Sequence, residues 1–326
     1  MKVQTSIVIV TWNSEGHLQQ CLESIGNQTY QDYEVIIVDN NSRNDVTALI
    51  YGTFPHLSVI RNKENLGFCT ACNQGIRASR GEFILILNPD VVLEPDCVRE
   101  LVTFLSNDAR YGSVGGKLLL AINGEKSTSI DSTGLFLGRD FRARDRGNLQ
   151  QDRGQYNRSG GVFAVCGAAV LFRRDALEGA KVGDEYFDED FFAYYDDLDL
   201  GWRMRLFGYE NGYTPRAIAY HVRGGSGGGA KFFQKSRALQ RITLRNRYLM
   251  LVKNLSIADL FCFCPFVLFT EIVLLLYICF RAPSLFGVYA ESCRNLKKYL
   301  RKRAVVQSLR VCTNKDIRAW IIADHG

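Results

Sequence analysis

The sequence predicts an α/β fold, in which an open, mostly parallel sheet carries helices on both faces and a helical region follows. Short continuous apolar runs alternate with segments whose apolar residues recur every three or four positions, as strands and helices require. The chain is 47% hydrophobic, which is enough for a packed core, and its 326 residues fit one large domain with an appendage, or two domains. We divide it into residues 1–255 and a hydrophobic, basic helical region, residues 256–326.

Four strands are expected in the first half, each a short apolar run: Ser6–Val10, Glu34–Val38, Leu57–Ile60 and Glu82–Leu87. The first is followed by N-cap chemistry at Asn13 and Ser14 and by an apolar helical stripe at Leu18, Cys21, Leu22 and Ile25. A second helix is expected to begin near Gly67, and a third near Pro95. This alternation predicts parallel strands covered by helices.

The second half is less regular. Residues Asp131–Gly161 are polar and rich in Gly, Arg and Asp, so we expect a long excursion outside the core. After it the patterns predict a strand-like run, a helix closed by Gly208, and a strand leading into His221: Gly161–Phe172, Asp196–Phe207 and Ala217–Tyr220.

The glycine-rich segment Arg223–Gly229 predicts a mobile loop. It matches neither G-x-G-x-x-G nor the P-loop pattern, so a dehydrogenase or an ordinary NTPase is poorly supported. A loop that folds over a diphosphate and a plain linker both remain open.

Polar residues stand where three predicted strands end, which is where open α/β sheets bind ligands. Asp39 offers hydrogen-bond acceptors to a base or ribose. Asp90 is a hard oxygen ligand for Mg²⁺ or Mn²⁺, and the nitrogen of His221 tilts the choice toward Mn²⁺. Each residue alone is typical of a turn. The three together favour function.

The helix beginning at Asp196 carries a second group of carboxylates. Leu198, Trp202 and Leu206 fall on one face, which predicts that this face packs inward, and Asp199 and Arg203 form an i,i+4 pair that locks the helix in place. Asp196 and Asp197 occupy the N-terminus, where carboxylates serve as caps. Two adjacent carboxylates seldom both cap, so one is expected to act as a general base.

Five ordered motifs give a resemblance to a known family: Ser6–Asn13, Val38–Ser42, Asn65–Phe68, Leu87–Asp90 and Tyr195–Arg203. Over roughly residues 3–255 the sequence resembles glycosyltransferase family 2, in the branch that contains bacterial rhamnosyltransferases. The segment Asp131–Leu135, with the Arg/Asp/Gly stretch after it, is loosely similar to the same branch.

The resemblance implies a GT-A fold, a nucleotide-diphospho-sugar donor and a divalent cation, Mn²⁺ or Mg²⁺. By position, Asp90 and His221 match metal ligands, Asp197 matches the catalytic base, and Asp196 lies beside it. The residues implied in nucleotide-sugar binding are Thr11, Asn13, Asp39, Asn65, Gly67, Asn73, Asn88, Asp90, Gly167 and Ala168. Asn88 stands at the first position of the family's D-x-D element, which leaves the cation's full ligand set open.

The resemblance implies an inverting transfer by a single displacement. The Q-x-x-R-W element of processive synthases is absent, so we expect transfer of one sugar rather than polymerisation. The branch implies rhamnose from dTDP-rhamnose, and a lipid-linked or cell-envelope polysaccharide as acceptor. The alternative is a non-catalytic nucleotide-sugar-binding or scaffold protein of the same fold.

The net charge of +6 is concentrated near the end of the chain, where residues 281–326 hold ten Lys/Arg against three Asp/Glu. Such a tail suits nucleic acid or an anionic membrane surface. The adjoining apolar run Leu260–Phe280 favours the membrane, and we expect no nucleic acid.

A spanning helix would bury Glu271 and carry the basic tail across the bilayer, against the positive-inside tendency. We therefore expect peripheral or monotopic helices on the cytoplasmic face, with Arg294–Arg303 on anionic headgroups. A buried hairpin or a homo-oligomer interface is the alternative. The absence of a secretory signal and the scattered cysteines also predict a cytosolic catalytic part.

Overall fold

The computed structural model describes residues 3–44, 57–122, 124–223 and 232–322, so most of the predicted loop Arg223–Gly229 lies outside the described residues. Its strands are β1 Thr5–Thr11, β2 Tyr33–Asp39, β3 Leu57–Arg61, β4 Phe83–Leu87, β5 Val91–Leu93, β6 Tyr111–Ile122, β7 Glu125–Ser132, β8 Leu135–Leu137, β9 Ala143–Asp145, β10 Gly160–Val162, β11 Ala169–Arg173 and β12 Glu210–His221. Its α-helices are α1 Glu15–Gly26, α2 Phe68–Ala78, α3 Cys97–Asn107, α4 Arg174–Gly179, α5 Asp196–Leu206, α6 Arg237–Asn254, α7 Ile257–Cys262, α8 Cys264–Arg281, α9 Phe286–Ser308 and α10 Asn314–Ile322.

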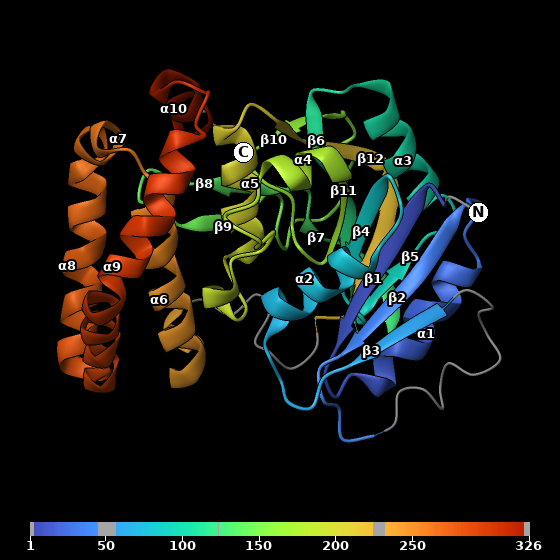
Figure 1. Ribbon diagram of the computed structural model, residues 1–326, viewed down its shortest axis with the longest axis horizontal. Helices are drawn as coiled ribbons and strands as arrows, with labels where there is room; N and C mark the ends of the chain where they lie inside the picture. Colours follow the sequence, from blue (N-terminus) through green and yellow to red (C-terminus); the bar gives the residue numbers. More distant parts are fainter. Residues whose placement is uncertain (1–2, 45–56, 123, 224–231, 323–326) are drawn as a thin grey trace.

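A central sheet organises the chain, in the order β10-β12-β6-β11-β4-β1-β2-β3, with β5 added to β12 and β7 to β6 (Figure 1). Strands β4, β1, β2 and β3 pair in parallel, so the parallel sheet expected from the first half is confirmed. In the second half β11 runs antiparallel to both neighbours, while β12 pairs in parallel with β6.

Helices cover both faces of the sheet, as the alternation predicted. Side chains of a strand point alternately to its two faces. Accordingly, Ile7 and Ile9 share a core with α1 and α3, whereas Val8 and Val10 share a core with α2 and α5. This two-sided burial explains why the predicted strands are continuously apolar rather than alternating.

Two expectations for the second half are wrong. The segment 131–161 is not an excursion outside the core, because Leu135, Leu137 and Phe141 are buried and the Phe141 ring stacks on Trp202 at 6.1 Å between centroids. The polar residues Asp131, Ser132 and Thr133 at its start are buried as well. The run 161–172 is also not one strand, because β10 and β11 pair with different neighbours.

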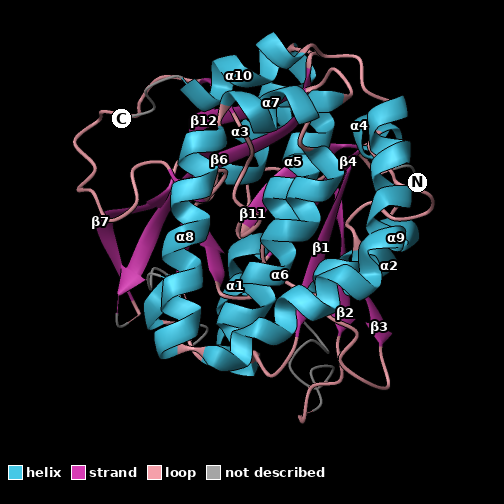
Figure 2. Cartoon of the chain, turned by 90° about the vertical axis from the view of Figure 1, so that its left-hand side faces the viewer, coloured by secondary structure: helices cyan, strands magenta, loops and turns pink. Residues whose placement is uncertain are grey.

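The C-terminal helices gather on one side of the sheet (Figures 1 and 2). Helix α6 packs against both α5 and α9, and Tyr299 and Val306 of α9 enter the same core as Trp202. Helix α8 alone, within the described residues, is long and apolar enough to cross a membrane. Most of it is exposed, Phe269 by 70% and Phe280 by 80%, which does not fit a buried hairpin.

The basic stretch 294–303 differs from the expectation that it lies on headgroups. Lys298 and Lys302 both contact the carboxylate of Asp190. Arg303 donates to the main-chain carbonyls of Val252 and Leu255. Lys302 faces the protein because the buried carboxylate of Asp188 needs a counter-charge. Arg294 and Arg301 remain exposed.

Candidate active site

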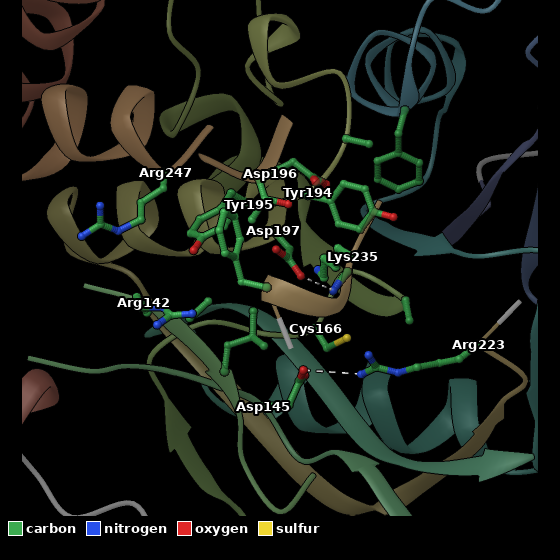
Figure 3. Close-up of a pocket in the computed structure, with 18 of the residues that line it drawn as sticks. Arg142, Asp145, Cys166, Tyr194, Tyr195, Asp196, Asp197, Arg223, Lys235 and Arg247 are labelled. Atoms are coloured by element: carbon green, nitrogen blue, oxygen red, sulfur yellow. Dashed lines mark hydrogen bonds and ion pairs between the residues drawn. The ribbon is translucent and has the colours of Figure 1, made fainter. Parts of the chain in front are cut away.

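A cavity of about 570 Å³ opens beside the carboxyl ends of β4 and β12 (Figure 3). It brings together Asn88 and Asp90 after β4, His221 at the end of β12, and Asp196 and Asp197 at the start of α5. It extends to the C-terminal helices, where Thr243, Leu244, Arg247 and Leu274 line it. Residues that are far apart in the sequence therefore share one site.

Asp197 is fixed by the backbone around it. Its Oδ2 accepts a hydrogen bond from the Gly167 amide at 3.0 Å, and its Oδ1 accepts one from the Leu198 amide at 2.7 Å. Gly167 suits this place because a Cβ there would lie 3.1 Å from the Cβ of Asp197. Burial raises the pKa of Asp197, while the hydrogen bond from Gly167 opposes that rise.

Asp196 lies deeper, with 7% of its surface exposed. Burial, and next the charge of Asp197, raises the pKa of Asp196 to about 8. Two adjacent carboxylates in a low-dielectric site cannot both ionise freely. At neutral pH the buried Asp196 therefore holds a proton, and the half-buried Asp197 is the carboxylate available to accept one.

The turn that leads into α5 has an uncommon backbone. Phe192, Tyr194 and Tyr195 all have left-handed conformations, with φ of 63°, 69° and 67°. Such values are unfavourable for aromatic residues and persist only where the surroundings hold them. Tyr194 and Tyr195 also line the cavity, although the sequence patterns did not indicate them as site residues.

His221 lies between two carboxylates. Its Nδ1 is 2.8 Å from Oδ2 of the fully buried Asp131, and its Nε2 is 3.4 Å from Oδ1 of Asp90. Burial alone would lower the pKa of His221, but the hydrogen bonds to Asp131 and Asp90 raise it to about 9. A carboxylate on Nδ1 directs the Nε2 atom toward Asp90.

Asp90 and His221 fit a divalent cation as two of its ligands. Among the residues that the structure describes, no cluster of three or more His, Cys, Asp or Glu side chains could hold a metal ion. One carboxylate and one imidazole are a donor set that suits Mn²⁺ or Mg²⁺ when phosphate oxygens and water complete the shell. A cation at Nε2 would compete with the proton on His221.

The sequence patterns missed an ion network behind this pair. Arg223 donates to Asp131 and lies 3.4 Å from Oδ2 of Asp145. Burial raises the pKa of Asp145 to about 6. Asp131 stood in a segment expected outside the core, and its membership of the loosely family-like segment Asp131–Leu135 was the signal that could have found it.

The residues expected to hold the nucleoside lie at the ends of β1 and β2. Thr11 pairs in register with Asp39, and the Thr11 Oγ1 is buried without a hydrogen-bond partner among the described residues. Asp39 accepts from the Ser42 amide at 2.9 Å, and Asn13 accepts from the Arg43 amide at 3.0 Å. They lie on the same edge of the sheet as Asp90 but do not line the cavity.

Asn65 and Gly67 shape the loop before α2. The side chain of Asn40 donates to Asn65 Oδ1 at 2.8 Å and to the Gly67 carbonyl at 3.1 Å, so both residues are held by the protein. The binding role expected for Asn73 does not fit its position. Asn73 is fully buried and exchanges two hydrogen bonds with the backbone of Phe187, at 2.8 and 2.9 Å.

The remaining expected residues lie at the cavity or support it. Asn88 and Ala168 line the cavity, and the Asn88 amide donates to the Ala168 carbonyl at 2.9 Å. The Asp199–Arg203 ion pair forms at 3.0 Å, fully buried, and Lys253 of α6 joins it at 2.9 Å from Asp199. This pair lies behind the cavity rather than in it.

The fold has solved relatives. A crystal structure of GalNAc-T7 with UDP, GalNAc and Mn²⁺ superposes with a TM-score of 0.60 at 16% sequence identity, covering 77% of this chain and 48% of that one. The architecture is therefore that of the GT-A fold. A family model described as glycosyl transferase family 2 matches residues 6–179. The chain belongs to this family.

Two curated relatives are similar to the chain. A poly-β-1,6-N-acetyl-D-glucosamine synthase of Staphylococcus epidermidis is 24% identical over 222 residues, which are 66% of this chain and 49% of the relative. An N-acetylglucosaminyltransferase of Bradyrhizobium diazoefficiens is 31% identical over 216 residues, which are 63% of this chain and 42% of the relative. The chain thus spans about half the length of the curated relatives it matches.

Proposed function

We propose that this chain is an inverting, cation-dependent glycosyltransferase that moves one sugar from a nucleotide-diphospho-sugar to an acceptor hydroxyl. The observation that carries the proposal is a single cavity that holds both the Asp90–His221 pair and the carboxylate of Asp197. A base and a leaving-group site in one cavity are what a direct displacement needs. A scaffold protein needs neither.

Asp197 accepts the proton of the acceptor hydroxyl as the acceptor oxygen attacks the anomeric carbon. The carbon–oxygen bond to the diphosphate breaks on the opposite face, so the anomeric configuration inverts and no enzyme nucleophile is used. The Gly167 and Leu198 amides hold Asp197 in place for this transfer. A divalent cation at Asp90 and His221 would neutralise the charge that develops on the leaving diphosphate.

The chemical class of the donor and its particular sugar rest on different support. A nucleotide-diphospho-sugar is supported by the family and by the UDP bound to GalNAc-T7. Rhamnose from dTDP-rhamnose rests on the motif resemblance alone, whereas the names of the two curated relatives point to N-acetylglucosamine. We therefore rank a UDP-linked N-acetylhexosamine ahead of dTDP-rhamnose.

The acceptor is proposed to be lipid-linked or a cell-envelope polysaccharide, and transfer is proposed to stop after one sugar. In this proposal residues 1–255 carry the chemistry, and residues 256–326 place it at the cytoplasmic face of a membrane. The exposed apolar side chains of α8 and the exposed cations Arg294 and Arg301 support membrane contact.

The test is a transfer assay with UDP- and dTDP-linked sugars, with Mn²⁺, Mg²⁺ or a chelator. We expect turnover with one nucleotide class, loss of turnover in chelator, and an inverted anomeric configuration by NMR of the product. A retained configuration would contradict the mechanism. Cation-dependent donor binding without turnover on any acceptor would favour the non-catalytic alternative.

A further inference from the structure

The left-handed turn before Asp196 is held by a residue of α6, near the end of the region 1–255. Asn246 lies in the middle of α6 and is fully buried. Its side-chain amide nitrogen lies 2.8, 2.7 and 2.8 Å from the main-chain carbonyl oxygens of Phe191, Ala193 and Tyr194, so its two hydrogens are shared among three acceptors. One side chain thus contacts three carbonyls within four consecutive residues.

These contacts answer a specific need of the turn. A chain with left-handed φ at Phe192, Tyr194 and Tyr195 has no regular hydrogen-bonding pattern for its carbonyl groups. The Phe192 carbonyl accepts from the amide of Phe68 at 2.6 Å, at the start of α2. Asn246 of α6 is the hydrogen-bond donor for the carbonyls of Phe191, Ala193 and Tyr194. The turn is therefore fixed between α2 and α6.

Helix α6 is itself tied to the catalytic helix and to α8. Lys253 and Asn254 bind the two carboxylate oxygens of Asp199 on α5, at 2.9 and 2.8 Å. Glu271 of α8 accepts from Arg247 at 2.5 Å and from Tyr248 at 2.6 Å, the two residues that follow Asn246. A continuous set of contacts therefore joins the exposed helix α8 to the turn that precedes Asp197.

We propose that Asn246 is a positioning residue for the catalytic base, so that α6 is part of the active site and not only a link to membrane-facing helices. By fixing the turn 191–195, Asn246 sets where α5 begins and hence where the carboxylate of Asp197 lies. The inference rests on the proposed function in one respect, the assignment of Asp197 as the base.

The test compares Asn246→Leu with Asn211→Leu. Asn211 is a matched control because it is also fully buried and its amide donates to two carbonyls, those of Phe163 and Gly201, at 2.7 and 2.9 Å. Both substitutions are expected to lower Tm. Only Asn246→Leu is expected to lower kcat, by about 100-fold, because a small misplacement of a catalytic group has that effect. Its KM for the donor should change little, since Asp90 and His221 are untouched.

A second readout does not depend on turnover. Hydrogen exchange of the amides in residues 187–199 should become faster in Asn246→Leu than in Asn211→Leu at equal loss of Tm. Equal exchange in the two variants, or a folded Asn246→Leu enzyme with unchanged kcat, would overturn the inference. If wild-type protein turns over no donor, the proposed function fails, while the exchange comparison still decides whether Asn246 holds the turn.

Discussion

Adjacent carboxylates at Asp196 and Asp197 share one helix N-terminus, yet their surroundings separate them. Asp196 is buried against the core, so its pKa is raised to about 8 and it holds a proton at neutral pH. Asp197 faces the cavity and receives two backbone amide hydrogen bonds. This separation assigns the proton-accepting role to one residue of the pair.

The assignment predicts unequal effects of the same substitution. Asp197→Asn removes the base and should lower kcat by about 10²–10⁴-fold. Asp196→Asn should lower it much less, because an amide resembles the protonated acid that already occupies this position. Single-turnover rates with saturating donor measure both. Full activity in Asp197→Asn would remove this residue from the mechanism.

Cation affinity is predicted to depend on a residue that does not touch the cation. Asp131 orients the His221 ring through Nδ1, and removal of such a partner lowers metal affinity by about 10–100-fold. Asp131→Asn should show this loss when Mn²⁺ binding is titrated by calorimetry. Asp152→Asn is the control, because Asp152 pairs with Lys117 and does not line the cavity. Unchanged affinity in folded Asp131→Asn would contradict the role.

Residue-level prediction from sequence depended on local rules. Strand ends indicated Asp90 and His221, a helix start indicated Asp196 and Asp197, and the structure brings the four into one cavity, while their roles stay predictions. Asp131 and Asn246 could not be found in this way, because their partners are 90 and 52 to 55 residues away in the chain. A polar residue inside an apolar helical stripe gives no sign of what it contacts.

At the scale of elements, the contact between α6, α9 and the segment 185–190 depends on buried charges. Asp188 is 2% exposed and binds Lys253 and Lys302, the second at 2.5 Å. Burial alone would raise the pKa of Asp188, but the two lysines lower it well below its usual range. Helices α6 and α9 are therefore held to the segment 185–190 through ionised groups as well as apolar packing.

This cluster predicts how stability changes with pH. Because the folded pKa of Asp188 is depressed, its stabilisation is present above the unfolded pKa of about 3.9 and is lost as pH falls through the lower folded value. Asp188→Asn should cost about 3–5 kcal/mol at pH 7, since it breaks a buried pair. Urea unfolding at pH 7 and at pH 3 should show that the difference from wild type shrinks in acid. A difference independent of pH would contradict the assignment.

Element prediction followed the strength of the repeating pattern. Continuous apolar runs located β1, β2, β3 and β4 to within about one residue at each end. For β1, β2 and β4 the reason is that a strand buried on both faces is apolar almost throughout. The same rule missed β8 and β9. Each has only three residues, and β9 has no fully buried side chain, so neither gives a long apolar run. The order of pairing in the second half is tertiary information that periodicity does not contain.

At the scale of the whole molecule, the two regions divided at residue 255 share one hydrophobic core. Tyr299 and Val306 of α9 belong to the same buried cluster as Trp202 and Phe187. Removing residues 256–326 would uncover this core, so a truncated chain cannot report on membrane contact alone. Substitutions confined to exposed side chains test membrane contact without uncovering the core.

The exposed apolar face of α7 and α8 predicts binding to a bilayer. Phe261 and Phe269 are 75% and 70% exposed and are not needed for the core. Each Phe buried in an apolar phase contributes about 1.5–3 kcal/mol, so the double variant Phe261→Ser/Phe269→Ser should lower partitioning onto vesicles by about 100-fold or more. Cosedimentation with anionic vesicles measures this, with wild-type Tm as evidence of intact folding.

The exposed face of α7 and α8 could be covered by a bilayer or by a second copy of the chain, and the two cases predict different results. If α8 contacts lipid, wild-type protein should be monomeric in mild detergent, and Arg294→Gln/Arg301→Gln should weaken binding to anionic vesicles but not to neutral ones, since cations near an anionic surface contribute about 1 kcal/mol each. If α8 is a homo-oligomer interface, light scattering should instead show dimers that the Phe261→Ser/Phe269→Ser variant dissociates. In that case vesicle binding should be equal for wild type and variant, and membrane contact would have to arise elsewhere.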